Sequence, residues 1–149
     1  MITDNLKLRG DVAIVLKDKN GNIKESREIN NLVVSAGLTF ICSRMAGTSA
    51  DVMSHMALGS STTAASAGQT DLVSILGSRE ALDSSTASAN TIAYVSSFEA
   101  GEGTGAVTEA GIFNDSTAGT MLCRTVFAVV NKQADDTMSV TWTITLTAS

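Results

Sequence analysis

Apolar and polar residues alternate along several short stretches of the chain, and this alternation is typical of β-strands with one buried face. It is most regular at 138–147, where Met, Val, Trp, Ile and Leu alternate with Ser and Thr. Residues 6–17 alternate in the same way, with Leu, Val and Ile on one face. The Asn20-Gly21 dipeptide that follows favours a tight hairpin turn, which predicts a returning strand at 23–29.

That returning strand is mostly charged, with Lys24, Glu25, Arg27 and Glu28 close together. Charged side chains at the edge of a sheet discourage pairing with other chains. We therefore expect this strand to lie at a sheet edge.

The second half of the chain carries further strand patterns. Residues 121–130 predict a strand with Cys123, Phe127 and Val129 facing the core. The remaining predicted strands are 91–99 and 106–113, with shorter ones at 53–59 and 79–83. The small-residue stretches 60–68 and 84–89 are predicted loops, and 71–76 is predicted to be a helical turn or a brief extended piece.

The apolar spacing changes to a helical period only at 35–46, where Ser35 is a candidate N-cap and Gly47 a candidate terminator. We expect the apolar stripe of this helix to cover a sheet. The pattern as a whole predicts an all-β fold, an antiparallel β-sandwich or jelly roll of eight to nine short strands with one short helix. At 149 residues we expect a single domain, with an N-terminal hairpin at 1–30 and a main body at 31–149.

Composition and charge exclude several classes of protein. Hydrophobic residues make up 44% of the chain and charged residues 17%, which argues against disorder and against a coiled coil. No apolar run is long enough for a membrane span or a signal peptide, so we expect no membrane partner and synthesis in the cytoplasm. The net charge is −5, and residues 51–149 alone carry −7 (three basic and ten acidic residues), so we expect no nucleic-acid partner.

Little in the sequence indicates catalysis or metal binding. His55 is the only histidine, and Cys42 and Cys123 are far apart in apolar contexts without a CxxC motif. We expect both cysteines to be buried and His55 to be structural. The sequence therefore predicts no catalytic residue, no cofactor and no metal site.

Glu109 and Arg124 are unusual because each lies inside a predicted strand. If these strands pair antiparallel across the loop at 114–119, residues whose numbers sum to about 233 face each other. We therefore predict a cross-strand ion pair between Glu109 and Arg124 that fixes the register of the two strands.

Several segments, in the same order, resemble small virion proteins of tailed bacteriophages. Residues 55–65, followed by Asp71-Leu72, are similar to one characteristic stretch of these proteins. Residues 105–113, followed by 119–124, are similar to a second, although Ser60-Ser61 in the first stands where a Gly-Thr pair is frequent. The helix entry at 30–38 and the closing segment at 141–145 extend the resemblance over residues 30–149.

The resemblance implies a non-enzymatic structural protein, a head decoration (cement) protein that binds and stabilises the outer surface of the capsid. Its partners would be the major capsid protein and further copies of itself, as a dimer or trimer. The N-terminal hairpin is the candidate contact with an acidic shell. Its basic residues are Lys7, Arg9, Lys17, Lys19, Lys24 and Arg27.

Two other functions remain open at this point. The first is a phage tail component such as a fibre, collar or baseplate adaptor, because related segments also occur in tail proteins. The second is a carbohydrate-binding module, which would need exposed aromatic side chains. Trp142 and Tyr94 both lie at inward positions of alternating strands, which does not favour that module.

Overall fold

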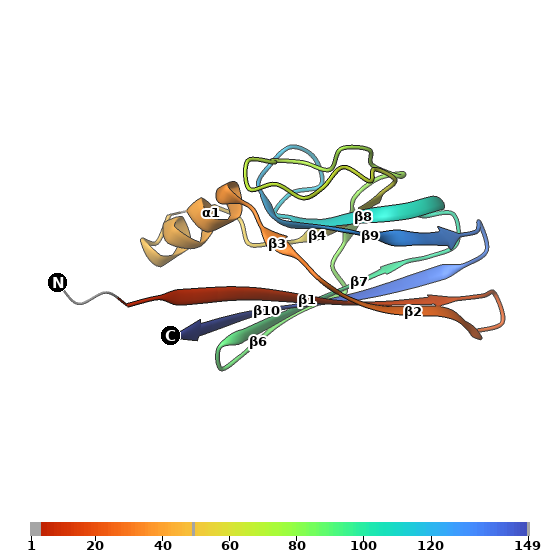
Figure 1. Cartoon of the computed structure of the whole chain (residues 1–149), viewed down its shortest axis with the longest axis horizontal. Helices are drawn as coiled ribbons and strands as arrows, with labels where there is room; N and C mark the ends of the chain where they lie inside the picture. Colours follow the sequence, from red (N-terminus) through yellow and green to blue (C-terminus); the bar gives the residue numbers. More distant parts are fainter. Residues whose placement is uncertain (1–3, 49, 149) are drawn as a thin grey trace.

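The computed structural model, which describes residues 4–48 and 50–148, consists of two five-stranded antiparallel sheets packed face to face (Figure 1). Sheet A has the strand order β2-β1-β10-β7-β6. Its strands are β1 (Leu6–Lys17), β2 (Ile23–Asn30), β6 (Ser84–Ser88), β7 (Thr91–Phe98) and β10 (Thr137–Ala148). Sheet B has the order β3-β9-β8-β4-β5. Its strands are β3 (Leu32–Val33), β4 (His55–Gly59), β5 (Glu80–Ala81), β8 (Gly105–Phe113) and β9 (Met121–Lys132).

The predicted sandwich class is confirmed in its coarse form, as two antiparallel sheets with one short helix, α1 (Ser35–Met45). The strands with regular alternation have the predicted positions, and β2 is an edge strand as its charge predicts. Asp18 orders the β1–β2 turn by accepting hydrogen bonds from the backbone N–H groups of Asn20 and Asn22. Gly21 provides the positive φ of +81° that this turn requires.

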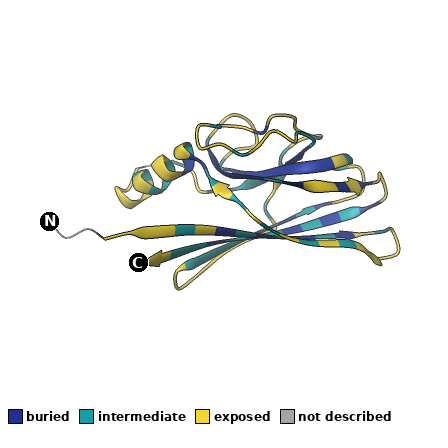
Figure 2. Cartoon of the chain, viewed as in Figure 1, coloured by how far each residue is buried: buried dark blue, intermediate teal, exposed yellow. Residues whose placement is uncertain are grey.

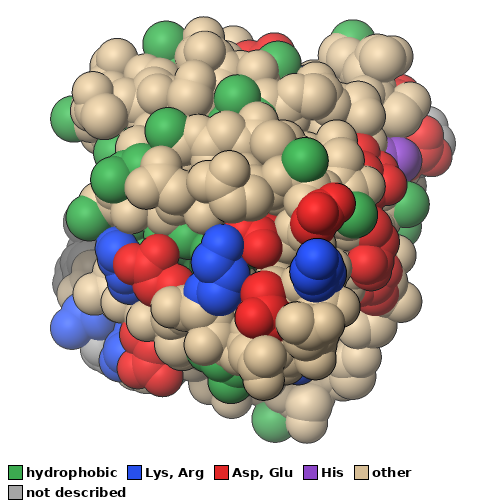
Figure 3. All heavy atoms as spheres, turned by 90° about the vertical axis from the view of Figure 1, so that its right-hand side faces the viewer, with side chains coloured by type: hydrophobic (Ala, Val, Ile, Leu, Met, Phe, Trp, Pro, Cys, Tyr) green, Lys and Arg blue, Asp and Glu red, His purple; other side chains and the backbone are tan. Residues whose placement is uncertain are grey.

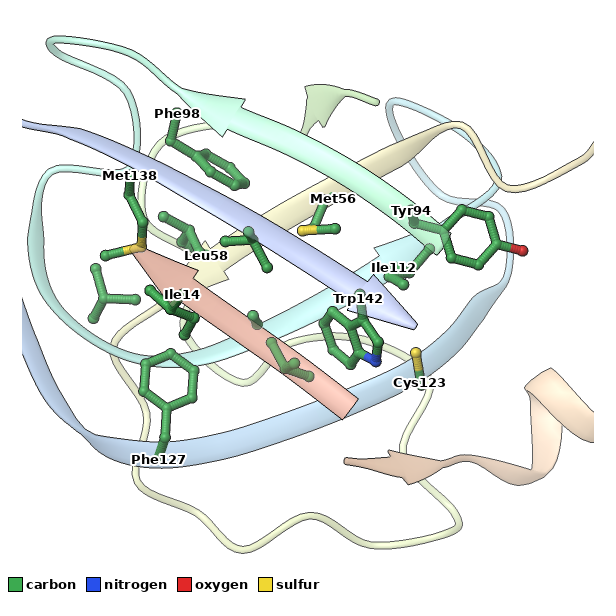
Figure 4. Packing of buried hydrophobic residues seen from close by; sticks show 14 of the residues in the cluster. Ile14, Met56, Leu58, Tyr94, Phe98, Ile112, Cys123, Phe127, Met138 and Trp142 are labelled. Carbon is green, nitrogen blue, oxygen red and sulfur yellow. The ribbon is translucent and has the colours of Figure 1, made fainter. Parts of the chain in front are cut away.

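The hydrophobic core lies between the sheets and follows the predicted alternation (Figure 2). Val12, Ile14 and Leu16 of β1 face inward, and Trp142 of β10 is fully buried beside them. Figure 4 shows the Trp142 indole near Cys123, which β9 contributes from the opposite sheet. Burying a side chain the size of Leu or Ile stabilises a fold by roughly 1.5–3 kcal/mol, so this layer is the main source of stability.

The stretch at 84–89 was predicted to be a loop, and this prediction is wrong for Ser84–Ser88, which form β6. Every residue of β6 is exposed, so no alternation of apolar side chains marks it in the sequence. Backbone pairing with β7, from Ser84 opposite Val95 to Ser88 opposite Thr91, defines the strand instead. The strand predicted at 79–83 is reduced to the two residues of β5, and 71–76 contributes only an isolated bridge between Ile75 and Gly59.

Val129 was predicted to face the core, but its side chain is 44% exposed and Val130 is buried in its place. The pairing of β8 with β9 is irregular between Val107 and Glu109, where three residues of β9 lie opposite one of β8. Such a bulge shifts the inward and outward phase of the strand. Alternation extended through the bulge therefore assigns Val129 to the wrong face.

Helix α1 is close to its predicted position, but its apolar side covers the core only in part: Phe40 and Ile41 pack against the core, whereas Cys42 is exposed. Gly37 is its only buried residue, and Leu38 and Met45 are 43% and 84% exposed. A Cβ on Gly37 would lie 2.1 Å from the backbone oxygen of Leu122, so the helix contacts β9 through a backbone approach that only glycine allows. Ser35 is the first helical residue rather than the cap: the N-cap is Val34, which makes no side-chain capping bond.

The two cysteines also differ from expectation, because Cys123 is buried as predicted whereas Cys42 of α1 is exposed. Burial raises the pKa of the Cys123 thiol well above its ordinary value. Within the described part of the chain, no helix has the length and apolar character needed to cross a membrane.

Candidate interaction site

Glu109 and Arg124 meet on the outer face of sheet B, and both side chains are fully buried. Arg124 Nε donates a hydrogen bond to Glu109 Oε2 at 2.9 Å. Arg124 Nη2 lies 2.8 Å from the same oxygen, in ion-pair contact but without the direction of a hydrogen bond. The structure therefore brings together the two charged residues that the sequence analysis paired.

The register predicted for this pair is wrong by two residues. Arg124 lies opposite Gly111, and Glu109 lies opposite Val126, so the two charges are diagonal neighbours on one face. The shift arises where the connecting loop closes: Phe113 pairs with Met121, with an irregularity after Ile112.

Glu109 is buried because the long loop, residues 60–79, crosses the outer face of sheet B above it (Figure 1). Backbone N–H groups of this loop donate to the carboxylate, from Ser74 at 2.7 Å, Val73 at 3.1 Å and Ser61 at 3.3 Å. Because its partners come from two separate parts of the loop, the carboxylate fixes the path of a segment that has little apolar surface of its own. These donors were not predicted, because backbone N–H groups leave no signal in a residue pattern.

Arg124 extends the same network to the middle of the long loop. Its Nη1 donates to Gln69 Oε1 at 3.0 Å, and that oxygen also accepts the backbone N–H of Ser66 at 3.0 Å. Gly59 allows the close approach, because a Cβ there would lie 2.4 Å from Glu109 Oε1. With these partners, the buried carboxylate is part of a structural network of side chains and loop backbone groups.

Arg79 is the last residue of the long loop, and its side chain holds this loop against the loop between β8 and β9. Its guanidinium lies over the Phe113 ring, 3.6 Å from the centroid, and donates to the backbone oxygens of Asp115 and Ala118 at 2.9 and 2.7 Å. Of the residues that carry the resemblance, Gly59, Ser61, Glu109 and Arg124 meet in the network around the buried carboxylate.

The six basic residues of the N-terminal hairpin do not form one patch. Lys7 and Arg9 lie near the start of β1, whereas Lys17 and Lys19 lie at the turn end of the hairpin. A 12-residue strand is about 40 Å long, so the two pairs are at opposite ends of the molecule. Figure 3 views the turn end, where basic and acidic side chains are interleaved.

In the part of the chain that the structure describes, three of the six basic side chains have an acidic partner. Arg9 lies 2.9 Å from Asp11, and Lys24 lies 2.7 Å from the buried Asp136 of the β9–β10 turn. Arg27 contacts Glu25 and donates to the backbone oxygens of Ala128 and Val129 at 3.1 and 3.3 Å. Arg27 therefore links the edge of sheet A to the bulge of β9.

The other notable surface is an apolar groove between α1 and sheet A, with a volume of about 540 Å³. Phe40, Ile41 and Met45 line it from the helix side, and Ile92, Tyr94, Ile144 and Leu146 line it from the sheet. Met45 and Val52 at its rim are 84% and 59% exposed. The groove was not predicted, because the apolar spacing of 35–46 indicates a helix that lies flat on the core.

Other candidate chemistry is sparse in the described residues. Ser54 Oγ lies 2.8 Å from Nδ1 of the half-buried His55, and no group of three or more His, Cys, Asp or Glu side chains at 4–48 and 50–148 is arranged to hold a metal ion. Trp142 and Tyr94 are buried, and burial raises the pKa of Tyr94 to about 12. Comparison of the chain with protein-family models, with curated proteins and with solved structures finds no match.

Proposed function

We propose that this chain is a non-enzymatic structural subunit of a tailed-phage virion, a decoration (cement) protein on the outer surface of the head. The observation that carries the proposal is the ordered set of segments that resembles small virion proteins, at 30–38, 55–65 with 71–72, 105–113 with 119–124, and 141–145. No catalytic residue, cofactor or metal is part of the proposal.

The network around Glu109 supports the proposal that those segments have a structural role. The residues that resemble virion proteins include Gly59, Glu109 and Arg124, whose role in the structure is to hold the long loop against sheet B. A buried carboxylate with an arginine and three backbone donors stabilises a loop, and this supports a structural role for these residues. The shared residues are therefore those that define a fold.

The surface of sheet A is suited to a protein that packs against a large neighbour. The outward face of β10 is a row of threonines, Thr141, Thr143 and Thr145, which are only partly exposed and carry no charge. Such a face loses little solvation when it is covered. Of the hairpin's basic residues, Lys7, for which the described part of the chain shows no ion-pair partner, lies near the start of β1 and is the favoured contact with an acidic shell.

The jelly roll expected within the sandwich class stays a prediction. The hairpins β1–β2, β6–β7 and β8–β9 each join neighbouring strands of one sheet, which favours a simpler sandwich connectivity. A carbohydrate-binding module is not favoured, because neither Trp142 nor Tyr94 offers an exposed ring.

The proposal is tested by adding the purified chain to heads that lack it. We expect saturable binding at a copy number of the order of hundreds per particle, and greater resistance of the heads to heat and osmotic shock. Binding to the tail at about three to eighteen copies would favour the alternative of a tail component. No binding to either part of the particle would overturn the proposal.

A further inference from the structure

The sheet edges of this sandwich are protected, with one exception. Edge strands expose unpaired N–H and C=O groups, and proteins commonly shield them with charge, short length or a covering segment. In sheet B both edge strands, β3 and β5, have two residues each. Beyond β5, the long loop covers β4, since Ser60 N donates to Ser74 O and Leu76 N donates to Leu58 O, both at 2.8 Å.

The first edge of sheet A is protected by charge. Strand β2 carries Lys24, Glu25, Arg27 and Glu28, and the part of β1 that extends beyond β2 carries Lys7 and Arg9. Arg27 also covers the free carbonyls of the β9 bulge. None of these edges is an open, uncharged strand.

The second edge of sheet A is β6, which has none of these protections. Its sequence, Ser-Ser-Thr-Ala-Ser, contains no charge, all five residues are exposed, and among the described residues its only strand partner is β7. An uncharged edge of this kind is a template for an added strand.

This open edge borders the apolar groove. Ser85 and Ala87 of β6 line the groove together with Phe40 and Met45 of α1 (the β6–β7 hairpin and α1 lie at the same end in Figure 1). In β-strand addition, backbone hydrogen bonds to the edge supply affinity, and pockets for alternate side chains supply specificity. The edge and the groove provide both parts of such a site.

We propose that β6 is the docking edge for an extended segment of the capsid shell subunit, which adds to sheet A as a sixth strand. Every second residue of that segment is a large apolar side chain that enters the groove between α1 and sheet A. Among the described residues that line the groove, Arg44 alone is charged, so the segment also carries a carboxylate that meets its guanidinium. This inference rests on the proposed function and names the surface through which the shell is bound.

A second copy of the chain is a poorer occupant of the same site. Pairing β6 with its own copy would direct only Ser85 and Ala87 of the partner toward the groove, and these side chains are too small to fill about 540 Å³. The exposed Met45 and Val52 at the rim would gain few contacts from them.

The test compares two lysine substitutions on neighbouring residues of β6 in binding to heads that lack the protein. Ala87→Lys places a charge in the groove, and Thr86→Lys places the same charge on the opposite face of the sheet. Both positions are exposed, so both variants are expected to unfold at the wild-type temperature. We expect Ala87→Lys to weaken binding by about tenfold or more and Thr86→Lys to change it by about threefold or less.

Equal binding by wild type and Ala87→Lys would overturn the inference and leave the proposed function intact, whereas failure of the wild-type chain to bind any head would overturn both. An electron cryomicroscopy map of the decorated head gives an independent readout. A strand of the shell subunit beside β6 supports the inference, and an uncovered β6 or a second copy of this chain beside it contradicts the inference.

Discussion

Glu109 shows what a residue pattern can and cannot predict about a buried charge. An acid inside one strand and a base inside the next were enough to predict the pair with Arg124. The three loop donors to the carboxylate come from Ser61, Val73 and Ser74, which lie in stretches without periodicity. Where the side chain's partners are backbone groups of an irregular loop, only the folded chain identifies them.

Removing the base should therefore be far more harmful than removing an exposed ion pair. Arg124→Ala leaves the Glu109 charge buried without its counter-charge, and we expect the free energy of unfolding to fall by about 3–5 kcal/mol. Arg9→Ala, which breaks the exposed pair with Asp11, is the control and should cost about 1 kcal/mol or less. Urea unfolding of both variants measures the difference, and equal losses would contradict a stabilising role for the buried pair.

At the scale of whole elements, prediction succeeded where one face of a strand is buried and failed where the backbone alone defines the element. The bounds of β1 and β10 follow from regular alternation of side chains. Strand β6 has no buried side chain, the bulge in β9 interrupts the alternation, and α1 contacts β9 through a glycine. In each of these three cases the element or contact depends on the backbone, so the hydrophobicity of the side chains does not predict it.

The contact between α1 and β9 can be tested by adding a single methyl group at Gly37. Gly37→Ala would place a Cβ 2.1 Å from Leu122 O, which the helix can avoid only by moving away from the sheet. We expect a loss of about 1–3 kcal/mol in the free energy of unfolding, as for other overpacked sites. Gly68→Ala is the matched control, because a Cβ at Gly68 meets nothing within 4 Å, and its stability should be close to wild type. Equal stability of the two variants would contradict the close helix contact.

The contact between β2 and the β9–β10 turn should depend on pH. The Lys24 ammonium and the Gln133 N–H hold the pKa of Asp136 below its usual value of 3.8. Because the folded-state pKa is depressed, this contribution to stability is complete above the unfolded value and is lost as the pH falls through the folded value.

Asp136→Asn should consequently be less stable than wild type at about pH 6, and the difference should shrink as the pH is lowered below about 4. The neighbouring Asp135, which is exposed, provides the control: Asp135→Asn should follow the wild-type curve. The readout is the urea midpoint at each pH. A constant gap between wild type and Asp136→Asn across the range would contradict the assignment.

At the scale of the whole molecule, the structure divides the basic hairpin into two ends. The sequence suggested one basic surface of six residues, because position along the chain does not reveal that β1 runs the length of the sandwich. Lys7 lies at the end that holds the groove, where its neighbour across the sheet is Thr147. Lys19 lies in the turn at the other end.

These two lysines therefore report which end of the protein approaches the shell. Lys7→Gln should weaken binding to heads and make the binding less dependent on salt, since it removes an attraction to an acidic surface. Lys19→Gln removes the same charge from the far end and should leave binding within about twofold of wild type. Titrations at low and high ionic strength measure both effects, and a larger effect at Lys19 would reverse the proposed orientation.

The pairing of Leu6 with Ala148 has a practical consequence for anyone who wishes to display cargo on such particles. The first and last strands place Leu6 and Ala148 side by side, at the end of the sandwich that holds the groove and β6. On the proposed orientation, a fluorescent protein or epitope attached beside Leu6 or Ala148 would be trapped between the subunit and the head. An insertion at 62–65, in the long loop on the opposite sheet, would instead face the surrounding medium.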